Sequence, residues 1–236
     1  MSLFFEGWVE VLAEKQKYKR GNGAQTDCVY SIYSGGDDLF FVGSWDVMPR
    51  LALDIRNDFA RFTAHHPGLH LSGGIALVGG KYPLYQAAAD AGEAEEQAKS
   101  RPGKNALTFL GQTEDWNTFA NEVDPCKDKL CALVRSKPAL RSLLRTLINL
   151  QLQYNREAEK RTQEGRDRSR TGQPQTYYGP WNWRAVYQLM RMEKRHKEVK
   201  QELAELRQLL GHEDFTSIRW IGLAARWAEL ELRKGA

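Results

Sequence analysis

Four consecutive residues, Gly35-Gly36-Asp37-Asp38, offer the most distinctive chemistry in the sequence. Two adjacent carboxylates repel each other, and strand-forming sequence seldom favours aspartate. A divalent cation turns this repulsion into attraction, and Mg²⁺ is typically held by one or two carboxylates plus substrate phosphates. Turn glycines permit positive φ and close approach of a ligand to the backbone. The pattern predicts a site for metal and phosphate, with an ordinary solvated turn as the alternative.

Apolar, strand-like runs on both sides of this tetrapeptide must position the carboxylates. The runs 28–32 and 39–43, separated by a Gly-Gly-Asp turn, predict a β-hairpin. Neighbouring residues on a regular strand point to opposite faces. Asp37 and Asp38 can therefore serve one site only if the turn distorts the tip of the hairpin.

Several further motifs follow the hairpin in a fixed order. They are an amphipathic helical stretch 44–66, a strand-like run 69–78 containing Ser72-Gly73-Gly74, a helical run 83–99 ending in Lys99, and a last strand 107–110 preceded by Lys104. In this order the motifs resemble the nucleotide-cyclising palm domain of the large subunit of type III CRISPR effector complexes, Csm type. That domain is a relative of GGDEF-type diguanylate cyclases and of polymerase palms. The resemblance covers residues 28 to about 111, and the C-terminal half is similar to the helical last domain of that subunit.

The resemblance implies an α+β fold, with a ferredoxin-like palm at 1–112 followed by an α-helical bundle domain at 113–236. A flexible loop is expected at about 156–176, where charges mix with Gly, Ser, Thr and Pro. The family palm runs β-α-α-β-β-α-β-α-β, and its first strand supplies another metal-binding aspartate. No such strand precedes Leu3, so the chain is expected to be a fragment or one half of a split subunit. A partner that adds this strand would repair both the sheet edge and the metal site.

The activity implied by the resemblance is that of a nucleotidyltransferase, which joins ATP into cyclic oligoadenylate through 3′–5′ phosphodiester bonds. Asp37 and Asp38 would hold two Mg²⁺ or Mn²⁺ ions that activate the attacking hydroxyl and stabilise the leaving pyrophosphate. The implied nucleotide-binding residues are Gly35, Gly36, Ser72, Lys99 and Lys104. Both features also have explanations that need no nucleotide. The glycines after Ser72 can form a β-bulge, and a lysine such as Lys99 near a helix C-terminus interacts favourably with the helix dipole.

The partners implied by the resemblance are the remaining part of the large subunit, in the same or a separate chain, and other type III effector subunits. Through the complex these would include crRNA and target RNA. Two other functions stay open. One is a non-catalytic scaffold whose helical half docks onto the small subunits, and the other is a GGDEF-like diguanylate cyclase that acts on GTP.

Composition limits the class of protein. The chain has 236 residues, a net charge of +4 and a pI near 8.9, so its basic excess is mild. No apolar run approaches the roughly 20 residues needed to cross a bilayer. The first residues lack the basic start and the long apolar core of a signal peptide, so we do not expect them to be one. Cys28, Cys126 and Cys131 cannot complete a disulfide framework, and the last two lack a second pair of zinc ligands. We expect a reduced, cytoplasmic protein.

Helical spacing dominates the rest of the sequence. Apolar residues predict helices over 3–17, 130–154 with a break at Lys137-Pro138, 183–210 and 216–233. The aromatic residues of the last helix favour a bundle core or a partner interface over a base-stacking platform. His65 and His66 invite a metal hypothesis, but consecutive residues point different ways, so solvated histidines at a helix end are favoured.

Overall fold

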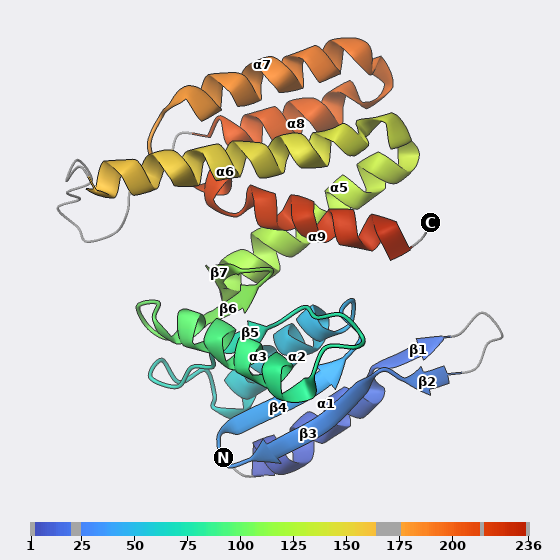
Figure 1. Cartoon of the computed structure of the whole chain (residues 1–236), viewed down its shortest axis with the longest axis vertical. Helices are drawn as coiled ribbons and strands as arrows, with labels where there is room; N and C mark the ends of the chain where they lie inside the picture. Colours follow the sequence, from blue (N-terminus) through green and yellow to red (C-terminus); the bar gives the residue numbers. More distant parts are fainter. Residues whose placement is uncertain (1–2, 20–24, 164–175, 213–214, 235–236) are drawn as a thin grey trace. The chain divides into compact units, whose positions relative to one another are not determined.

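The computed structural model describes residues 3–19, 25–163, 176–212 and 215–234, and the fold is α+β (Figure 1). The chain packs into two compact units, an N-terminal unit, Met1–Ala120, and a helical unit, Asn121–Ala236. The sequence-based boundary at 112 falls at the first residue of strand β7 (Gln112–Asp115), which pairs with the strand before it.

A β-hairpin begins the sheet structure that carries the candidate site. Strand β3 (Val29–Gly35) pairs antiparallel with β4 (Asp38–Gly43), and the register shifts between Ser31 and Tyr33. Such a shift is a β-bulge, which bends the strand and increases its twist. The short strands β1 (Lys17–Lys19) and β2 (Gln25–Asp27) form a separate antiparallel pair.

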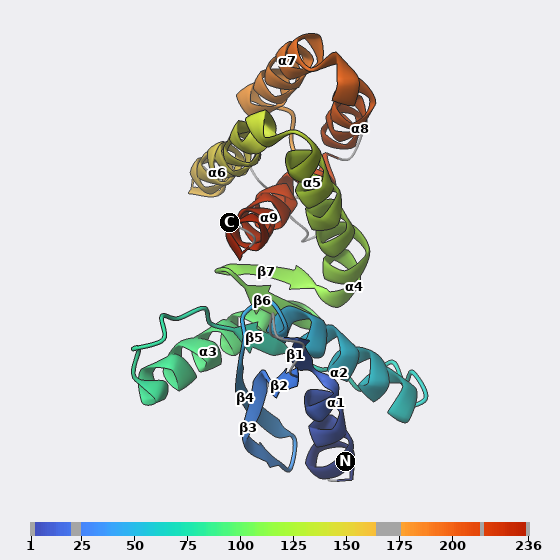
Figure 2. The ribbon, with the colours of Figure 1, turned by 90° about the vertical axis from the view of Figure 1, so that its right-hand side faces the viewer.

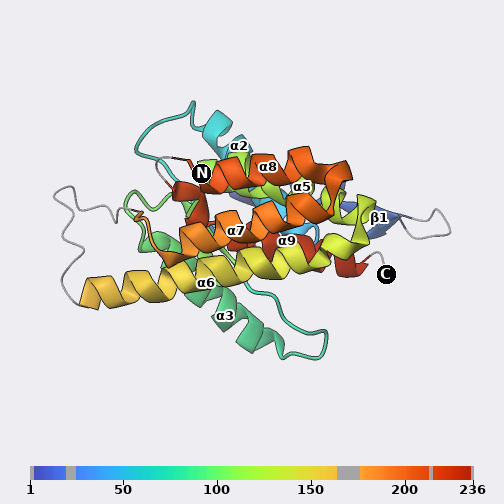
Figure 3. The ribbon, with the colours of Figure 1, turned by 90° about the horizontal axis from the view of Figure 1, so that it is seen from above.

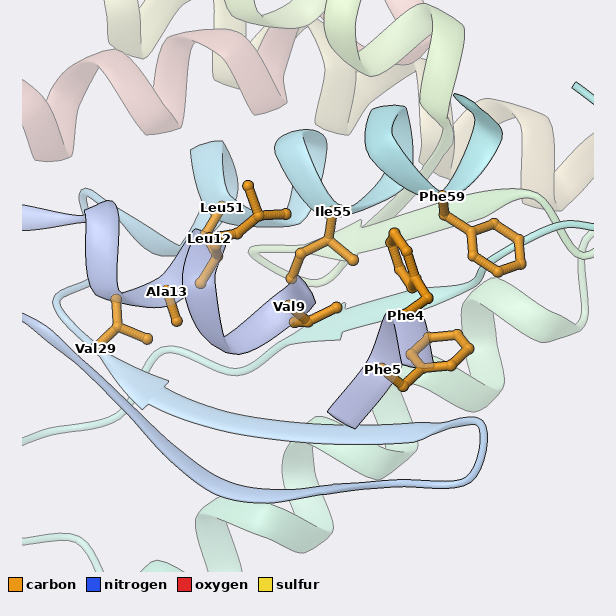
Figure 4. Close-up of a cluster of buried hydrophobic side chains, with 9 residues drawn as sticks. All are labelled: Phe4, Phe5, Val9, Leu12, Ala13, Val29, Leu51, Ile55 and Phe59. Carbon is orange, nitrogen blue, oxygen red and sulfur yellow. The ribbon is translucent and has the colours of Figure 1, made fainter. Parts of the chain in front are cut away.

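One apolar cluster fastens the hairpin to the helices around it. Its side chains come from the π-helical turn η1 (Leu3–Trp8), α1 (Val9–Lys15), β3 and α2 (Met48–Phe62). Figure 4 shows them meeting between the hairpin and α2: Phe4, Phe5, Val9, Leu12, Ala13, Val29, Leu51, Ile55 and Phe59. Burying each large side chain contributes roughly 1.5–3 kcal/mol, so this cluster holds the hairpin in place.

The other sheet of this unit has the strand order β5-β6-β7. Strands β5 (Gly73–Ile75) and β6 (Ala106–Phe109) are parallel, and β7 runs antiparallel to β6. Helix α3 (Leu84–Lys99) packs against β5 and β6 (Figure 2). Within the described residues, β4 bonds only to β3, and β5 only to β6. The hairpin and the three-stranded sheet are therefore not joined by a hydrogen-bond ladder.

Five longer helices make the helical unit. They are α5 (Asp124–Ser136), α6 (Arg141–Gln163), α7 (Pro180–Arg195), α8 (Lys200–Leu210) and α9 (Ile221–Lys234). Helix α6 packs against α9 and α7, and α7 packs against α8 (Figure 3). The core is mainly aliphatic, with Leu130, Leu143, Leu147, Leu189 and Leu203 fully buried. No helix in the described ranges is long and apolar enough to cross a membrane.

The structure corrects several predicted element boundaries. The predicted strand 69–78 contains only the three residues of β5, and β7 was not predicted because its residues are polar. The predicted helix 183–210 breaks at His196 into α7 and α8, which fold back on each other. Helix α6 continues to Gln163, so the loop expected from about 156 begins later. Most of that predicted loop, 164–175, lies outside the described residues.

Candidate active site

The two carboxylates lie at the tip of the β3–β4 hairpin. Gly35 pairs with Asp38, so the connecting turn consists of Gly36 and Asp37. Gly36 has φ +68°, which an L side chain rarely adopts. Asp37 lies in the turn itself, while Asp38 is the first residue of β4, and both are exposed. They are therefore not consecutive residues of one regular strand, and the alternation of strand faces does not separate them.

Ser34 ties the tip of the hairpin to the first helical turn. Its hydroxyl donates a hydrogen bond to the backbone carbonyl of Phe5, whose ring is in the apolar cluster. The sequence contains no signal for this contact, because the acceptor is a backbone group 29 positions away. Ser34 is thus a positioning residue that sequence reasoning missed. The exposed rings of Tyr30 and Tyr33 on the same strand leave much of the hairpin's outer surface apolar.

Lys99, the last residue of α3, lies within electrostatic reach of the hairpin. Its ammonium is 3.0 Å from a carboxylate oxygen of Glu95 and 3.7 Å from one of Glu96. The hydrogen bond to Glu95 raises the pKa of Lys99, slight burial opposes this, and the charges of Glu95, Glu96 and Asp38 add to the rise. The structure therefore brings Lys99 towards Asp38 and gives it two acidic neighbours on its own helix.

Ser72 and Lys104 come together through the backbone. The Ser72 hydroxyl donates to the Lys104 carbonyl at 2.8 Å, which joins the segment before β5 to the segment before β6. Lys104 has φ +47°, and its side chain is exposed. The buried indole of Trp116 donates to the carbonyl of Leu71 at 2.8 Å and so fixes the residue before Ser72. Trp116 is a second positioning residue that the sequence did not indicate.

The strand glycines after Ser72 have a packing reason. A Cβ at Gly74 would lie 2.3 Å from the backbone nitrogen of Glu95 and 2.5 Å from the carbonyl oxygen of Ala91, both in α3. The sequence offered a nucleotide or a β-bulge as the reason for these glycines. The structure adds a packing reason, because helix α3 approaches the strand too closely at Gly74 for any side chain.

The donor set at the hairpin suits a hard cation. Carboxylate oxygens are the ligands that Mg²⁺ and Mn²⁺ prefer, and substrate phosphates usually complete the shell. Within the described part of the chain, no three His, Cys, Asp or Glu side chains gather as a metal site. The two carboxylates of Asp37 and Asp38 are thus chemically suited to a hard divalent cation.

His65 and His66 follow the C-terminal end of α2 and help to line a hollow of about 150 Å³. Ala64 and His65 adopt positive φ as the helix ends, and His65 N–H donates to the carbonyl of Ala60. His66 accepts a hydrogen bond from the Gly68 N–H through Nδ1 at 3.1 Å, and both imidazoles are exposed. These contacts close the turn after α2.

Residues 1–108 match the family described as Cas10/Cmr2, second palm domain. Among curated proteins, the Cas10/Csm1 single-strand-specific deoxyribonuclease (subtype III-A) of Methanocaldococcus jannaschii is 31% identical over 144 residues, 55% of this chain and 18% of that protein. The corresponding Mycobacterium tuberculosis protein is 34% identical over 128 residues, 52% of this chain and 16% of that protein. The chain thus spans less than a fifth of the length of these two relatives.

Solved structures of Csm1–Csm4 cassettes have the same fold. A cassette in complex with one ATP superposes with a TM-score of 0.65 at 18% identity and covers 96% of this chain and 31% of the other. A cassette in complex with cA3 gives a TM-score of 0.63 at 17% identity, with 97% and 31% coverage. The comparisons bear out the resemblance seen in the sequence: residues 1–108 match the Cas10/Cmr2 second palm family, and the chain is similar over 128 to 144 residues to Cas10/Csm1 proteins of subtype III-A CRISPR systems.

Proposed function

We propose that the N-terminal unit is the ATP-joining half-site of a Csm1-type protein and makes cyclic oligoadenylate once the rest of that protein is present. The observation that carries this is the pair of exposed carboxylates at the hairpin tip, one in the turn and one beginning β4. The ATP and cA3 named for the Csm1–Csm4 structures support an adenine nucleotide as substrate and a cyclic product.

Asp37 and Asp38 would hold the divalent ions. When bound, Mg²⁺ or Mn²⁺ would activate a 3′-hydroxyl and stabilise the leaving pyrophosphate. The task of the protein is to fix the two carboxylates, and it does so with the Gly36 turn and the bond from Ser34 to the Phe5 carbonyl. In the absence of metal the two carboxylates repel each other, which favours cation binding.

Polar groups around the hairpin would contact the nucleotide. Gly35 and Gly36 carry no side chain that blocks phosphate from backbone N–H groups. Lys99, within electrostatic reach of Asp38, would exchange part of its pairing with Glu95 for a triphosphate oxygen. Ser72 and Lys104, held together by their hydrogen bond, would form the opposite wall of the site.

A strand from elsewhere in the family protein would complete the sheet. Strands β4 and β5 each bond to one neighbour only in the described residues, and a strand edge presents unsatisfied N–H and C=O groups. A strand that pairs along these edges would produce the expected ferredoxin-like palm and would bring the further metal-binding aspartate. We propose that the remaining part of the large subunit supplies it, in the same or a separate chain. A Csm4-type subunit, crRNA and target RNA would join through the assembly.

The curated relatives are named as single-strand-specific deoxyribonucleases. The chain spans less than a fifth of the length of these relatives, so we do not carry their named activity over to it. We propose that the complete protein handles single-stranded DNA and that cleavage resides in a part of it outside these residues.

Nucleotide-dependent stabilisation of the assembled protein separates this function from the alternatives. A ligand that binds only the native state adds about 2.7 kcal/mol at 100 times its Kd, which raises the thermal midpoint by several degrees. We expect ATP with Mg²⁺ or Mn²⁺ to produce this shift, and the double variant Asp37→Asn/Asp38→Asn to abolish it. A shift with GTP but not ATP would favour the diguanylate cyclase, and no shift with either nucleotide would favour the scaffold.

A further inference from the structure

Helices α6 and α7 concentrate the positive charge of the molecule. Helix α6 contains five basic and two acidic side chains and α7 contains four basic and one acidic, a net charge of +6, although the whole chain carries only +4. Of the acidic residues, Glu193 is buried and accepts a hydrogen bond from Arg207 at 2.8 Å, and Glu157 and Glu159 lie in the C-terminal part of α6. The surface of the two helices is therefore strongly basic outside that end of α6.

Helix α7 also carries most of the exposed aromatic residues of the helical unit's described part. Among its described residues, the large apolar side chains that remain exposed are Leu152, Tyr178, Trp183, Tyr187 and Met190. Trp183, Tyr187 and Met190 are spaced i, i+4, i+7, so they lie on one face of α7. The helical rise separates Trp183 from Tyr187 by about 6 Å along the axis.

Contacts between the helices join the aromatic and the basic side chains into one surface. Arg184 of α7 donates to the side chain of Gln153 in α6 at 2.9 Å, and its guanidinium lies 5.4 Å from the Trp183 ring centroid. Figure 3 shows α6 and α7 running alongside each other. We call this the α6–α7 surface, made of Arg145, Leu152, Arg156, Arg184, Trp183, Tyr187, Met190, Arg191 and Lys194.

The distribution of charge indicates the occupant. Aromatic residues, Met and Arg are enriched at protein interfaces too, so residue types alone do not identify the occupant. The net charge of +6 on α6 and α7 complements a polyanion such as a nucleic acid. Aromatic rings that stack with bases, interspersed with basic side chains that meet phosphates, are how proteins hold single strands without sequence preference. Duplexes offer no unstacked bases to such rings.

We propose that the α6–α7 surface binds single-stranded DNA. The rings of Trp183 and Tyr187 stack with bases, and Arg145, Arg156 and Arg191 neutralise the phosphates. The choice of DNA over RNA rests on the proposed function, in which the complete protein handles single-stranded DNA. The surface consists of other residues than the hairpin carboxylates, so binding to this surface and ATP conversion at the hairpin are tested by different variants.

Fluorescence anisotropy with the full chain and labelled oligothymidylate of about 20 nucleotides tests the proposal. Trp183→Ala/Tyr187→Ala should weaken binding at least about tenfold, since each stacked base contributes measurably. Arg145→Gln/Arg191→Gln should weaken binding and also reduce its dependence on salt, because fewer counterions are released. The matched control, Lys129→Gln/Arg226→Gln, removes two exposed positive charges from α5 and α9 and should leave binding within about twofold.

Several outcomes would overturn the proposal. One is a loss of oligothymidylate affinity in the control variant as large as in the test variants, and another is unchanged affinity in both test variants. Tighter binding of a duplex, or much tighter binding of oligouridylate, than of oligothymidylate would also overturn it. Binding of a Csm-type protein subunit that is lost with these variants while DNA binding is kept would assign the surface to a protein. All the substituted side chains of the test pairs are at the surface, and circular dichroism checks the fold. Conversion of ATP by the assembled protein should persist in the Trp183→Ala/Tyr187→Ala variant, which keeps this test distinct from that of the hairpin.

Discussion

The two units of the chain satisfy their backbone and apolar groups in different ways. In the helical unit, backbone groups bond within each helix, and aliphatic stripes meet in one core around Leu147 and Leu189. In the N-terminal unit, three small sheets remain unconnected, and most of the exposed large apolar side chains of the described residues are found there. The helical unit is therefore more self-contained, whereas the unit that carries the candidate active site leaves strand edges for another segment to use.

Gly74→Ala should cause the largest change in the stability of one unit relative to the other. The added methyl group would collide with the backbone of α3 at Glu95 and Ala91, and neither atom belongs to a flexible side chain that could move aside. We expect a loss of more than about 4 kcal/mol in the stability of the N-terminal unit, with little effect on the helical unit. Chemical denaturation with separate probes in the two units measures this.

Gly92→Ala in the same helix is the matched control. A Cβ at Gly92 meets nothing within 4 Å, so the change should stabilise α3 by about 0.5–1 kcal/mol through helix propensity. Equal destabilisation by the two substitutions would show that the close approach at Gly74 is not what packs α3 on the sheet.

Hydrogen exchange at the strand edges should sharpen the comparison next. If a further strand pairs beside β4 and β5, their amides should exchange on the order of 100-fold more slowly in the complete Csm1-type protein than in this chain alone. Amides in the middle of α6 and α9 should change little and serve as the internal reference. Strong protection of β3 and β4 in the isolated chain would mean that the hairpin needs no added strand.

Alkaline pH should weaken the helical unit through Cys126. Burial raises the pKa of this thiol from 9.0 to about 12, although the positive charge of Lys129 acts in the opposite direction. The unfolded chain loses the proton first, so the stabilisation is present below pH 9 and falls by about 1.4 kcal/mol per pH unit between pH 9 and about 12. The difference in unfolding free energy between wild type and Cys126→Ala should shrink over that range. A constant difference would contradict the claim that burial raises the pKa of this thiol.

The sequence predicted elements well where local pattern decides them. The turn within Gly35-Gly36-Asp37 follows from turn chemistry, α2 from the helical spacing of its apolar residues, and α3 from the helix propensity of its alanine-rich sequence. The long-range contacts could not be predicted. Ser34 and Trp116 bond to backbone carbonyls 29 and 45 positions away, and no pattern in their own surroundings indicates those acceptors.

The candidate site shows the same division between local and long-range information. The adjacent carboxylates were recognisable from their types, but the position of Asp37 in the turn and Asp38 on β4 required the register of the hairpin. The proximity of Lys99 to Asp38 depends on the packing of α3 beside the strands. Gly74 was assigned to a ligand or a bulge because the sequence does not show that a helix backbone lies against it.

The synthesis of cyclic oligoadenylate by the assembled Csm1-type protein tests the central claim most directly. With ATP and Mn²⁺ or Mg²⁺, Asp37→Asn and Asp38→Asn should each reduce product at least about 100-fold, because each removes a charge that would hold the catalytic metals. Asp90→Asn, which removes a half-buried carboxylate that accepts a hydrogen bond from the Tyr82 hydroxyl at 2.9 Å, should leave synthesis within about twofold. Unchanged synthesis in both hairpin variants, with assembly intact, would contradict the account.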